Sequence, residues 1–195
     1  MPRIVGQTVA ENRDLRQTAL LNAAAEIAHE QGLSAVTVGA VAERAGIARS
    51  SVYSYFSSGA DMIADILVDE LITMATQLRE ATAPATTEEE AIDLWMRAAL
   101  RYVIEGRHAF VRAASNADLP PTRKAQVNGL HHAMAVPLLR ALQHRGEVES
   151  MRLAQQINAV VEVCVRRIEH GSDVETEIAA AKQFIYLGLG PESED

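Results

Sequence analysis

Aromatic residues are scarce in this 195-residue chain, at 4% of the sequence, and there are only six prolines and one cysteine. Few aromatic side chains favour helices over strands, and so do the abundant alanines and leucines. The single cysteine, Cys164, excludes an internal disulfide and is typical of a reducing cytoplasm. No apolar run reaches the roughly 18 residues of a membrane span, and residues 1–11 lack the apolar segment of a signal peptide. We therefore expect an all-α, cytoplasmic protein with no membrane partner.

Positive charge is also scarce, because 26 acidic residues outnumber 18 basic ones and give a net charge of −8. This balance at first argues against a partner as acidic as DNA. The deficit is unevenly distributed, however. Residues 1–60 hold five arginines and five acids and are neutral, so the whole deficit falls after residue 60. Only the first part of the chain is therefore expected to contact phosphates.

Helical periodicity runs through almost the entire chain. A first helix presents Leu20, Ala24, Ile27 and Ala28 on one face and ends at Gly32. Two short helices are expected next, the first from the N-cap residue Thr37 to about residue 45 and the second over 48–55. Longer helices are expected over 58–82, 87–106, 106–116, 121–146, 149–170 and 172–187, with a kink at Pro137 and a disordered tail from residue 190.

Polar residues at the expected helix starts support these boundaries. Ser58 precedes Asp61, and Ser172 precedes Glu175, with the spacing of a capping box, in which a hydroxyl and a carboxylate bind free backbone N–H groups. Thr87 precedes three glutamates, which complement the positive end of a helix dipole. The pattern predicts two domains, a three-helix domain over 1–57 and a larger helical domain over 58–195.

The two short helices carry the main functional signal. Gly46 permits the sharp turn that a helix-turn-helix requires, and Ala42 and Ala45 are small enough for close helix packing. In the second helix Val52 and Phe56 lie four residues apart and are expected in the core. The remaining side chains offer a guanidinium, hydroxyls and phenols to the major groove or to phosphates. The expected DNA-contacting residues are Thr37, Arg49, Ser50, Ser51, Tyr53, Tyr55 and Ser58.

A series of short motifs spans residues 16–62, namely Glu30-Gln31-Gly32-Leu33, Thr37-Val38, Ala45-Gly46-Ile47, Val52-Tyr53 and Tyr55-Phe56. Together these motifs resemble the tetracycline-repressor (TetR) family. The resemblance implies a homodimer whose first three helices bind double-stranded operator DNA and whose remaining helices hold a small-molecule pocket and the dimer surface. The implied activity is that of a repressor that an effector releases from its operator. No enzymatic activity, cofactor or metal is expected.

Four positions depart from the family pattern. Ala28 stands where phenylalanine is usual, and Ala48 replaces a frequent serine, so that this cap is missing or shifted to Ser50. Gly59 replaces a frequent lysine, which removes a phosphate contact, and Ser50 replaces a frequent glycine.

Two arginines near the start of the chain, Arg3 and Arg13, lie outside these motifs. They are expected to belong either to a flexible arm that reaches the adjacent groove or to a tail without DNA contact.

The second domain offers candidates for an effector pocket, with plain core packing as the alternative for each. Trp95 and Tyr102 lie seven residues apart, hence on one helix face, and both carry polar groups. Few charges point inward, so a largely apolar or aromatic effector with one or two hydrogen-bonding groups is expected. The expected ligand-binding residues are Trp95, Tyr102, Phe110, His131 and Met134.

The resemblance also implies that the last two helices pair across a two-fold axis into a four-helix bundle. Both helices carry an apolar stripe in the sequence. The expected dimer residues are Ile157, Val161, Cys164, Ile178 and Ile185.

Two other classes of function compete with this interpretation. Glu26-x-x-His29 and Glu105-x-x-His108 have the spacing found in di-iron helical bundles, but two further bridging glutamates are not evident. A helical adaptor without DNA binding would explain the apolar helix over 149–170. It would leave the pattern from Arg49 to Phe56 unexplained.

Overall fold

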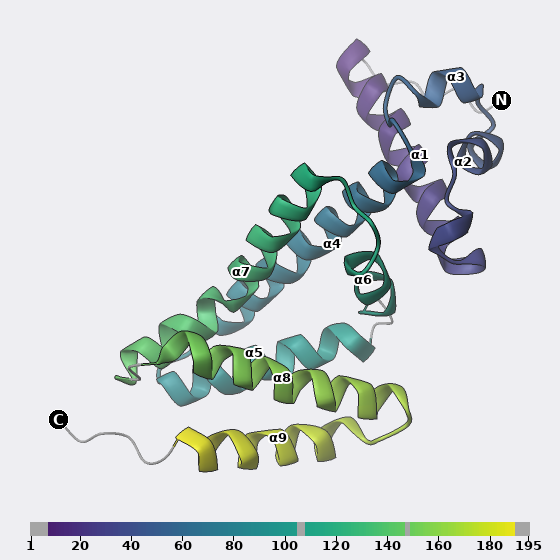
Figure 1. The fold of residues 1–195 in the computed structure, drawn as a ribbon. Helices are drawn as coiled ribbons and strands as arrows, with labels where there is room; N and C mark the ends of the chain where they lie inside the picture. The colour runs from purple at the N-terminus through teal and green to yellow at the C-terminus, as the bar shows by residue number, and fades with distance from the viewer. Residues whose placement is uncertain (1–7, 105–107, 147–148, 190–195) are drawn as a thin grey trace. The chain divides into compact units, whose positions relative to one another are not determined.

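The computed structural model describes residues 8–104, 108–146 and 149–189, and the regular elements in these ranges are all helices (Figure 1). The expected all-α fold is confirmed. None of the described helices combines the length and apolar character that a bilayer crossing requires. In chain order the elements are α1 (Val9–Gln31), the 3-10 turn η1 (Leu33–Ala35), α2 (Val38–Ala45), α3 (Arg49–Val52), α4 (Gly59–Thr82), α5 (Glu88–Ile104), α6 (His108–Ser115), α7 (Pro121–His144), α8 (Ser150–Glu169) and α9 (Val174–Leu189).

The chain divides into two compact units whose boundary differs from the predicted cut at 57/58. The first unit consists of Met1–Glu70 and Phe110–Asn128, and the second of Leu71–Ala109 and Gly129–Asp195. Within the first unit, the guanidinium of Arg123 on α7 forms an ion pair with the carboxylate of Asp65 on α4. Burial raises the pKa of Asp65, and the charge of Arg123 opposes this shift. Such a contact joins segments far apart in the chain, which a linear division of the sequence cannot anticipate.

The core of the first unit consists of small and medium apolar side chains at the spacing that the sequence pattern indicated. Both the face of α1 predicted to be apolar and the predicted anchors of the helix-turn-helix are shielded from solvent. The residues include Leu20, Ala24, Ile27, Ala28, Val41, Ala42, Val52, Phe56 and Met62.

The first helix begins much earlier than the family motifs do. The backbone N–H of Glu11 donates to Thr8 Oγ1 at 3.1 Å, and the backbone N–H of Thr8 donates to Glu11 Oε2 at 2.9 Å. This reciprocal capping box fixes the helix start. Arg13 is therefore part of α1, and its expected place in a flexible arm or tail is wrong. Arg3 lies outside the described residues.

The other predicted caps have mixed outcomes. The hydroxyl of Thr87 accepts the backbone N–H of Glu90 at 3.1 Å, as expected for the start of α5. The hydroxyl of Ser58 accepts from the backbone of Asp61 at 3.1 Å, but the carboxylate of Asp61 binds Ser57. The predicted capping box at Ser172 is wrong. The cap of α9 is Asp173, whose carboxylate accepts the N–H and hydroxyl of Thr176 at 2.9 Å each.

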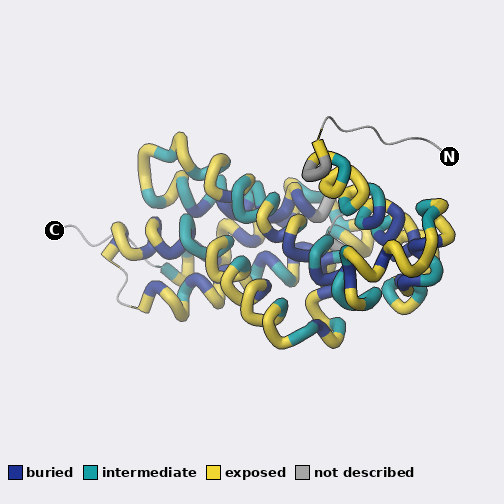
Figure 2. Tube along the Cα trace, turned by 90° about the horizontal axis from the view of Figure 1, so that it is seen from above, coloured by how far each residue is buried: buried dark blue, intermediate teal, exposed yellow. Residues whose placement is uncertain are grey.

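Buried stripes run along the helices of the second unit (Figure 2). The indole N–H of Trp95 donates to the backbone carbonyl of Met134 at 2.9 Å and so joins α5 to α7. Pro137 lies inside α7, which continues past it to His144. The most buried core side chains come from α4, α5, α7, α8 and α9 and include Leu78, Ile92, Trp95, Met96, Leu100, Leu138, Leu142, Val165 and Ala181.

Gly59 begins α4 at a point where the chain has no room for a side chain. A Cβ atom placed on Gly59 would lie 1.9 Å from the carbonyl oxygen and 2.9 Å from the carbonyl carbon of Val36. Both neighbours are backbone atoms, which cannot rotate away as the end of a flexible side chain can. The glycine is therefore required by the close approach of α4 to the segment that precedes α2.

We expect Gly59→Ala to destabilise the protein by about 1–3 kcal/mol, because the new methyl group overlaps the Val36 carbonyl and forces the backbone to move. Gly129→Ala in α7 is the matched control. A Cβ at Gly129 meets no atom within 4 Å, and alanine is favoured over glycine in a helix by about 1 kcal/mol. Urea denaturation followed by circular dichroism measures both free energies of unfolding. A stabilised Gly59→Ala variant would contradict the close approach.

Candidate nucleic-acid interface

The turn between α2 and α3 sets the direction of α3. Thr37 caps α2, since its hydroxyl accepts the backbone N–H of Ala40 at 3.1 Å. Gly46 ends the helix in the left-handed region, with φ 68° and ψ 32°. The backbone N–H of Ile47 then donates to the carbonyl of Ala42 at 3.0 Å and closes the turn. A residue with a side chain would be strained at Gly46, so the glycine is what permits the tight connection.

The orientation of α3 follows from two buried anchors. Val52 is 0% exposed and Phe56 is 3% exposed, whereas Tyr53 between them is 52% exposed. Arg49, Ser50 and Ser51 are also exposed. The short helix therefore presents a guanidinium, two hydroxyls and a phenol on its accessible side, as the sequence pattern predicts.

The recognition segment is less regular than expected. The helix ends at Val52, and Tyr53–Tyr55 form a turn in place of the predicted helix to residue 55. Ala48 precedes the helix and makes no side-chain capping bond. The serine cap that the family pattern would supply is therefore missing here.

Two arginines lie over tyrosine rings in the first unit. The guanidinium carbon of Arg49 lies 6.0 Å from the ring centre of Tyr53, and Arg49 Nη2 donates to the Tyr53 hydroxyl at 3.4 Å. The guanidinium carbon of Arg13 lies 5.6 Å from the ring centre of Tyr55. The spacing of Arg49 and Tyr53 is readable from the sequence as neighbours on a helix. No sequence pattern indicates that Arg13 contacts Tyr55, because they belong to different segments.

A third arginine is engaged by acids instead. Arg44 of α2 pairs with Glu26 at 3.2 Å and with Glu30 at 2.7 Å, both on α1. Its hydrogen bonds lower the pKa of Glu30. In the part of the chain that the structure describes, no ion pair is recorded for Arg13, Arg16 or Arg49. Of the arginines that the structure describes in residues 8–60, one is thus tied to carboxylates and three are available to another partner.

Two further predicted DNA contacts serve as caps in the structure. Thr37 and Ser58 each accept a backbone N–H at the start of a helix. A hydroxyl that accepts at a cap keeps its own proton for donation, so both remain able to donate to a phosphate.

The predicted di-iron motif is not assembled in the described residues. Glu26 is held by Arg44, and no group of three potential metal ligands occurs there. Glu105 lies outside the described residues.

The predicted effector residues line neither of the pockets recorded in the described residues. Trp95 and Tyr102 are core residues, 3% and 2% exposed, and Met134 is half-buried beside Trp95. Phe110 is half-buried and belongs to the first unit. The inward placement of His131 is wrong. Its position on α7 is exposed, although partial desolvation lowers the pKa of His131.

The five residues predicted to form the dimer surface are instead buried within a single chain. Ile157, Val161, Cys164, Ile178 and Ile185 are each 4–5% exposed, because α8 and α9 pack on each other and on α5 through these faces. The strongest apolar stripe of each helix therefore serves the chain's own core. The sequence analysis missed a second set of large apolar side chains on the same two helices that is exposed. It consists of Met151, Val163, Phe184 and Leu187.

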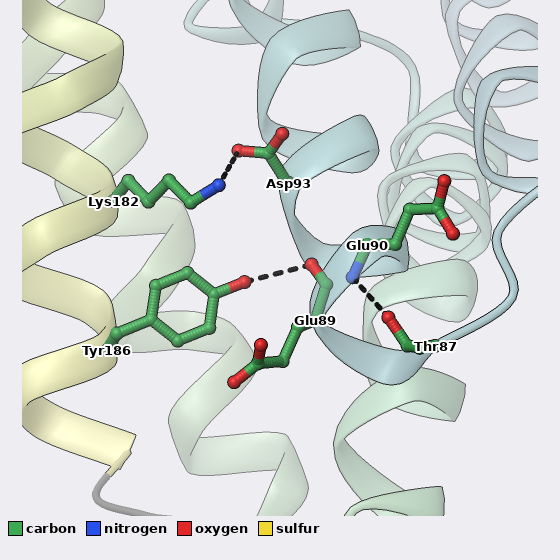
Figure 3. A pocket seen from close by; sticks show the side chains of 6 residues that line it. All are labelled: Thr87, Glu89, Glu90, Asp93, Lys182 and Tyr186. Atoms are coloured by element: carbon green, nitrogen blue, oxygen red, sulfur yellow. Dashed lines mark hydrogen bonds and ion pairs between the residues drawn. The ribbon is translucent and has the colours of Figure 1, made fainter.

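A pocket of about 420 Å³ in the second unit lies between the first turn of α5 and α9 (Figure 3). Its lining residues are Thr87, Glu89, Glu90, Asp93, Lys182 and Tyr186. The Tyr186 hydroxyl donates to the backbone carbonyl of Glu89 at 2.9 Å, and burial raises the pKa of Tyr186 to about 12. The lining contains three carboxylates and one ammonium, so it is acidic and differs from the apolar site that was expected.

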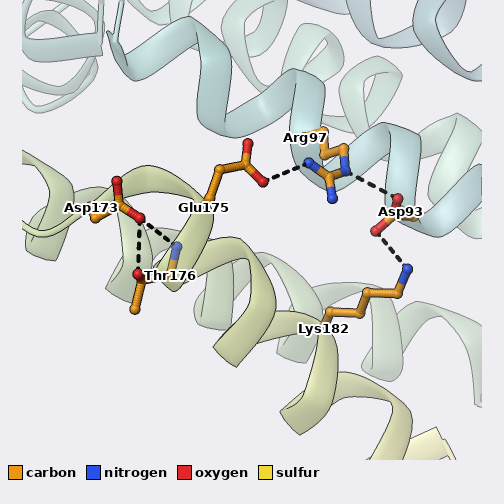
Figure 4. A network of polar contacts seen from close by, with 6 residues as sticks. All are labelled: Asp93, Arg97, Asp173, Glu175, Thr176 and Lys182. Carbon is orange, nitrogen blue, oxygen red and sulfur yellow. Dashed lines mark hydrogen bonds and ion pairs between the residues drawn. The ribbon is translucent and has the colours of Figure 1, made fainter.

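The same two helices are joined by a polar network (Figure 4). Asp93 pairs with Arg97 at 3.1 Å and with Lys182 at 3.2 Å, and Arg97 reaches Glu175 at 3.2 Å. This network fixes α9 against α5. A second pocket, of about 410 Å³, is lined by Arg79, Arg140 and His144 among others, and neither pocket is lined by the predicted effector residues.

Comparison with known proteins adds to this geometry. Residues 20–66 match the family model described as bacterial regulatory proteins, tetR family. Over 104 residues the chain is 36% identical to the HTH-type transcriptional repressor KstR2 of Rhodococcus jostii (strain RHA1), covering 48% of this chain and 51% of that protein. The chain thus spans about half the length of this curated relative.

Solved structures share the fold over nearly the whole chain. FadR from Bacillus subtilis, in complex with stearoyl-CoA, has a TM-score of 0.72 at 16% identity and covers 89% of this chain and 99% of its own. PfmR from Thermus thermophilus has a TM-score of 0.68 at 20% identity and covers 88% and 99%. The matched motif region, the helix-turn-helix and the all-helical architecture agree. Residues 20–66 therefore match the N-terminal segment of the tetR family of bacterial regulatory proteins, and the likeness of the rest of the chain to solved structures shows a shared fold.

Proposed function

We propose that this protein is a homodimeric transcriptional regulator that binds operator DNA through α3 and acts as a repressor released by a small-molecule effector. The observation that carries this proposal is the arrangement of α3, in which Val52 and Phe56 are buried and Arg49, Ser51 and Tyr53 are exposed. A helix that presents such donors beyond a tight turn fits the major groove. The repressor role is supported by the printed role of the Rhodococcus jostii relative.

Arg49→Ala is expected to weaken operator binding by about 1–3 kcal/mol if Arg49 reads a base, and to relax sequence preference at that position. If Arg49 contacts only phosphate, the loss is equal on all sequences. Ser51→Ala and Tyr53→Ala are expected to weaken binding as well. Fluorescence anisotropy on a duplex selected from random sequences measures these changes. Arg140→Ala, an exposed arginine of α7, is the matched control. Unchanged affinity in all three α3 variants would remove α3 from the interface and favour an adaptor.

The dimer surface that we propose is the exposed apolar set on α8 and α9, in place of the buried residues first expected. Phe184 is 66% exposed and Leu187 is 76% exposed, three residues apart on α9. Met151 and Val163 are exposed on α8, which packs on α9 in the same unit. A second copy of the chain would bury these side chains in a four-helix arrangement.

Phe184→Glu is expected to raise the dimer dissociation constant by about tenfold or more, because a charge replaces a large apolar contact. Operator affinity falls with it, since two linked half-site readers bind better than one. Sedimentation velocity across a range of concentrations gives the oligomeric state. Gln126→Glu, an exposed position of α7 in the first unit, is the control for added charge. A wild-type monomer at micromolar concentration would end this part of the proposal.

Effector control is the third part of the proposal. The second unit has an apolar core around Trp95, with few charges directed into it. A largely apolar effector with one polar end would have to open this packed core, because neither pocket recorded in the described residues is lined by Trp95. The stearoyl-CoA complex of the Bacillus subtilis neighbour supports an acyl compound as the first class to test. We therefore propose an apolar, acyl-type effector that favours a conformation with low DNA affinity.

Trp95 reports on this step because it is the chain's single tryptophan. Stearoyl-CoA is expected to change the Trp95 emission, to add about 2.7 kcal/mol of stability at 100 times its dissociation constant, and to lower operator affinity. Coenzyme A without the acyl chain is the control and is expected to do none of these. Emission and operator affinity that both ignore acyl compounds would exclude this effector class while leaving DNA binding intact.

A further inference from the structure

Arg13 and Tyr55 form a contact that the helix-turn-helix alone does not explain. The guanidinium carbon of Arg13 lies 5.6 Å from the ring centre of Tyr55, within the range of a cation–π interaction. Arg13 belongs to the second turn of α1, and Tyr55 follows α3. Both residues are in the first unit. The contact therefore joins the start of α1 to the end of the recognition segment.

Each partner is held by its own backbone. The capping box between Thr8 and Glu11 fixes the first turn of α1 and so presents Arg13 from a formed helix. The backbone N–H of Tyr55 donates to the carbonyl of Val52 at 2.9 Å, and the side chains of Val52 and Phe56 are buried. Tyr55 itself is half-buried, and this burial restricts the positions that its ring can take. A guanidinium held over a ring by a cation–π contact keeps the N–H groups in its own plane free for a bidentate anion.

The charges around the pair leave Arg13 available. Glu11, the acid of the capping box, accepts the backbone N–H of Thr8 with its carboxylate. Arg44, by contrast, is bound by two glutamates of α1. In the described residues no carboxylate is recorded within ion-pair distance of Arg13, which is exposed. A domain with no net positive charge depends on the few arginines that are not neutralised.

We infer that Arg13, held over the ring of Tyr55, forms a binding site for a phosphodiester of the DNA backbone, separate from the base-reading face of α3. Arg13 is the phosphate ligand, and Tyr55 is the positioning residue that holds its guanidinium in place. This inference rests on the proposed function and extends it from α3 to α1. It predicts contacts that add affinity but no sequence information, because every sequence offers the same phosphates.

Arg13→Ala is expected to weaken binding to the selected operator and to a random duplex by the same factor. Each phosphate contact contributes about 0.9 to the slope of log K against log salt concentration, so a dimer loses about 1.8 in slope. At about 0.1 M salt the same loss corresponds to a roughly 60-fold lower association constant. Anisotropy titrations over a series of salt concentrations give both numbers, and circular dichroism confirms that the variant is folded.

The role of Tyr55 is tested by combining variants. Tyr55→Leu removes the ring and is expected to cost nearly as much as Arg13→Ala, and the double variant is expected to be little worse than either. In a Tyr55→Phe background the ring remains, so Arg13→Ala keeps its full effect. Arg16→Ala is the matched control, because Arg16 is an exposed arginine of α1 without a recorded ring contact. The change in binding free energy caused by Arg16→Ala, whatever its size, is expected to add to the change caused by Tyr55→Leu.

Three results would overturn the inference. The first is an Arg13→Ala variant with unchanged affinity and salt slope, and the second is strict additivity of Arg13→Ala with Tyr55→Leu. Both would leave the proposed function standing if the wild-type protein binds its operator and Arg49→Ala weakens it. The third is a wild-type protein that binds no duplex, which would remove the proposed function and this site together.

Discussion

Val52 and Phe56 lie four residues apart and are almost inaccessible to solvent. The burial of these two anchors determines which side chains of the recognition segment are exposed. With both residues in the core, a helix as short as Arg49–Val52 has only one way to face outward. Its exposed side then carries Arg49, Ser50, Ser51 and Tyr53. The tight turn at Gly46 delivers the chain to this position, but the anchors determine its rotation. Functional chemistry on the surface therefore depends on hydrophobic burial beneath it.

The second organising principle of the first unit is the separation of its charges. Glu26 and Glu30 of α1 form ion pairs with Arg44 of α2, so the charges of these two carboxylates are partly compensated. Among the other described arginines of residues 8–60, Arg13 and Arg49 lie over aromatic rings and Arg16 is exposed. A domain that is neutral by composition can still present a positive surface to a polyanion, because the local field depends on where the charges lie and on how they are paired.

The sequence was a good guide to features that depend on neighbours in the chain. Helix starts at Thr37 and Thr87, the glycine turn, and the anchors at Val52 and Phe56 each follow from residues within about one or two helical turns. Features that depend on distant contacts were missed or misplaced. His131 lies on the outside of α7, and Asp65 finds Arg123 across the first unit. Ile157 and its four companions show a further limit. An apolar stripe indicates burial, but it does not say whether the chain itself or a partner covers it.

The close approach at Gly59 has a consequence for how this sequence can change over generations. A lysine is frequent at this position in the resembled family, yet here a first side-chain atom would collide with the Val36 carbonyl. A single substitution of Gly59 to lysine is therefore blocked unless the segment around Val36 shifts first. The effect of a substitution at Gly59 therefore depends on the residues around Val36, which is a form of epistasis. A substitution that adds a cation to this domain is therefore accommodated more easily at an exposed helix position than at Gly59.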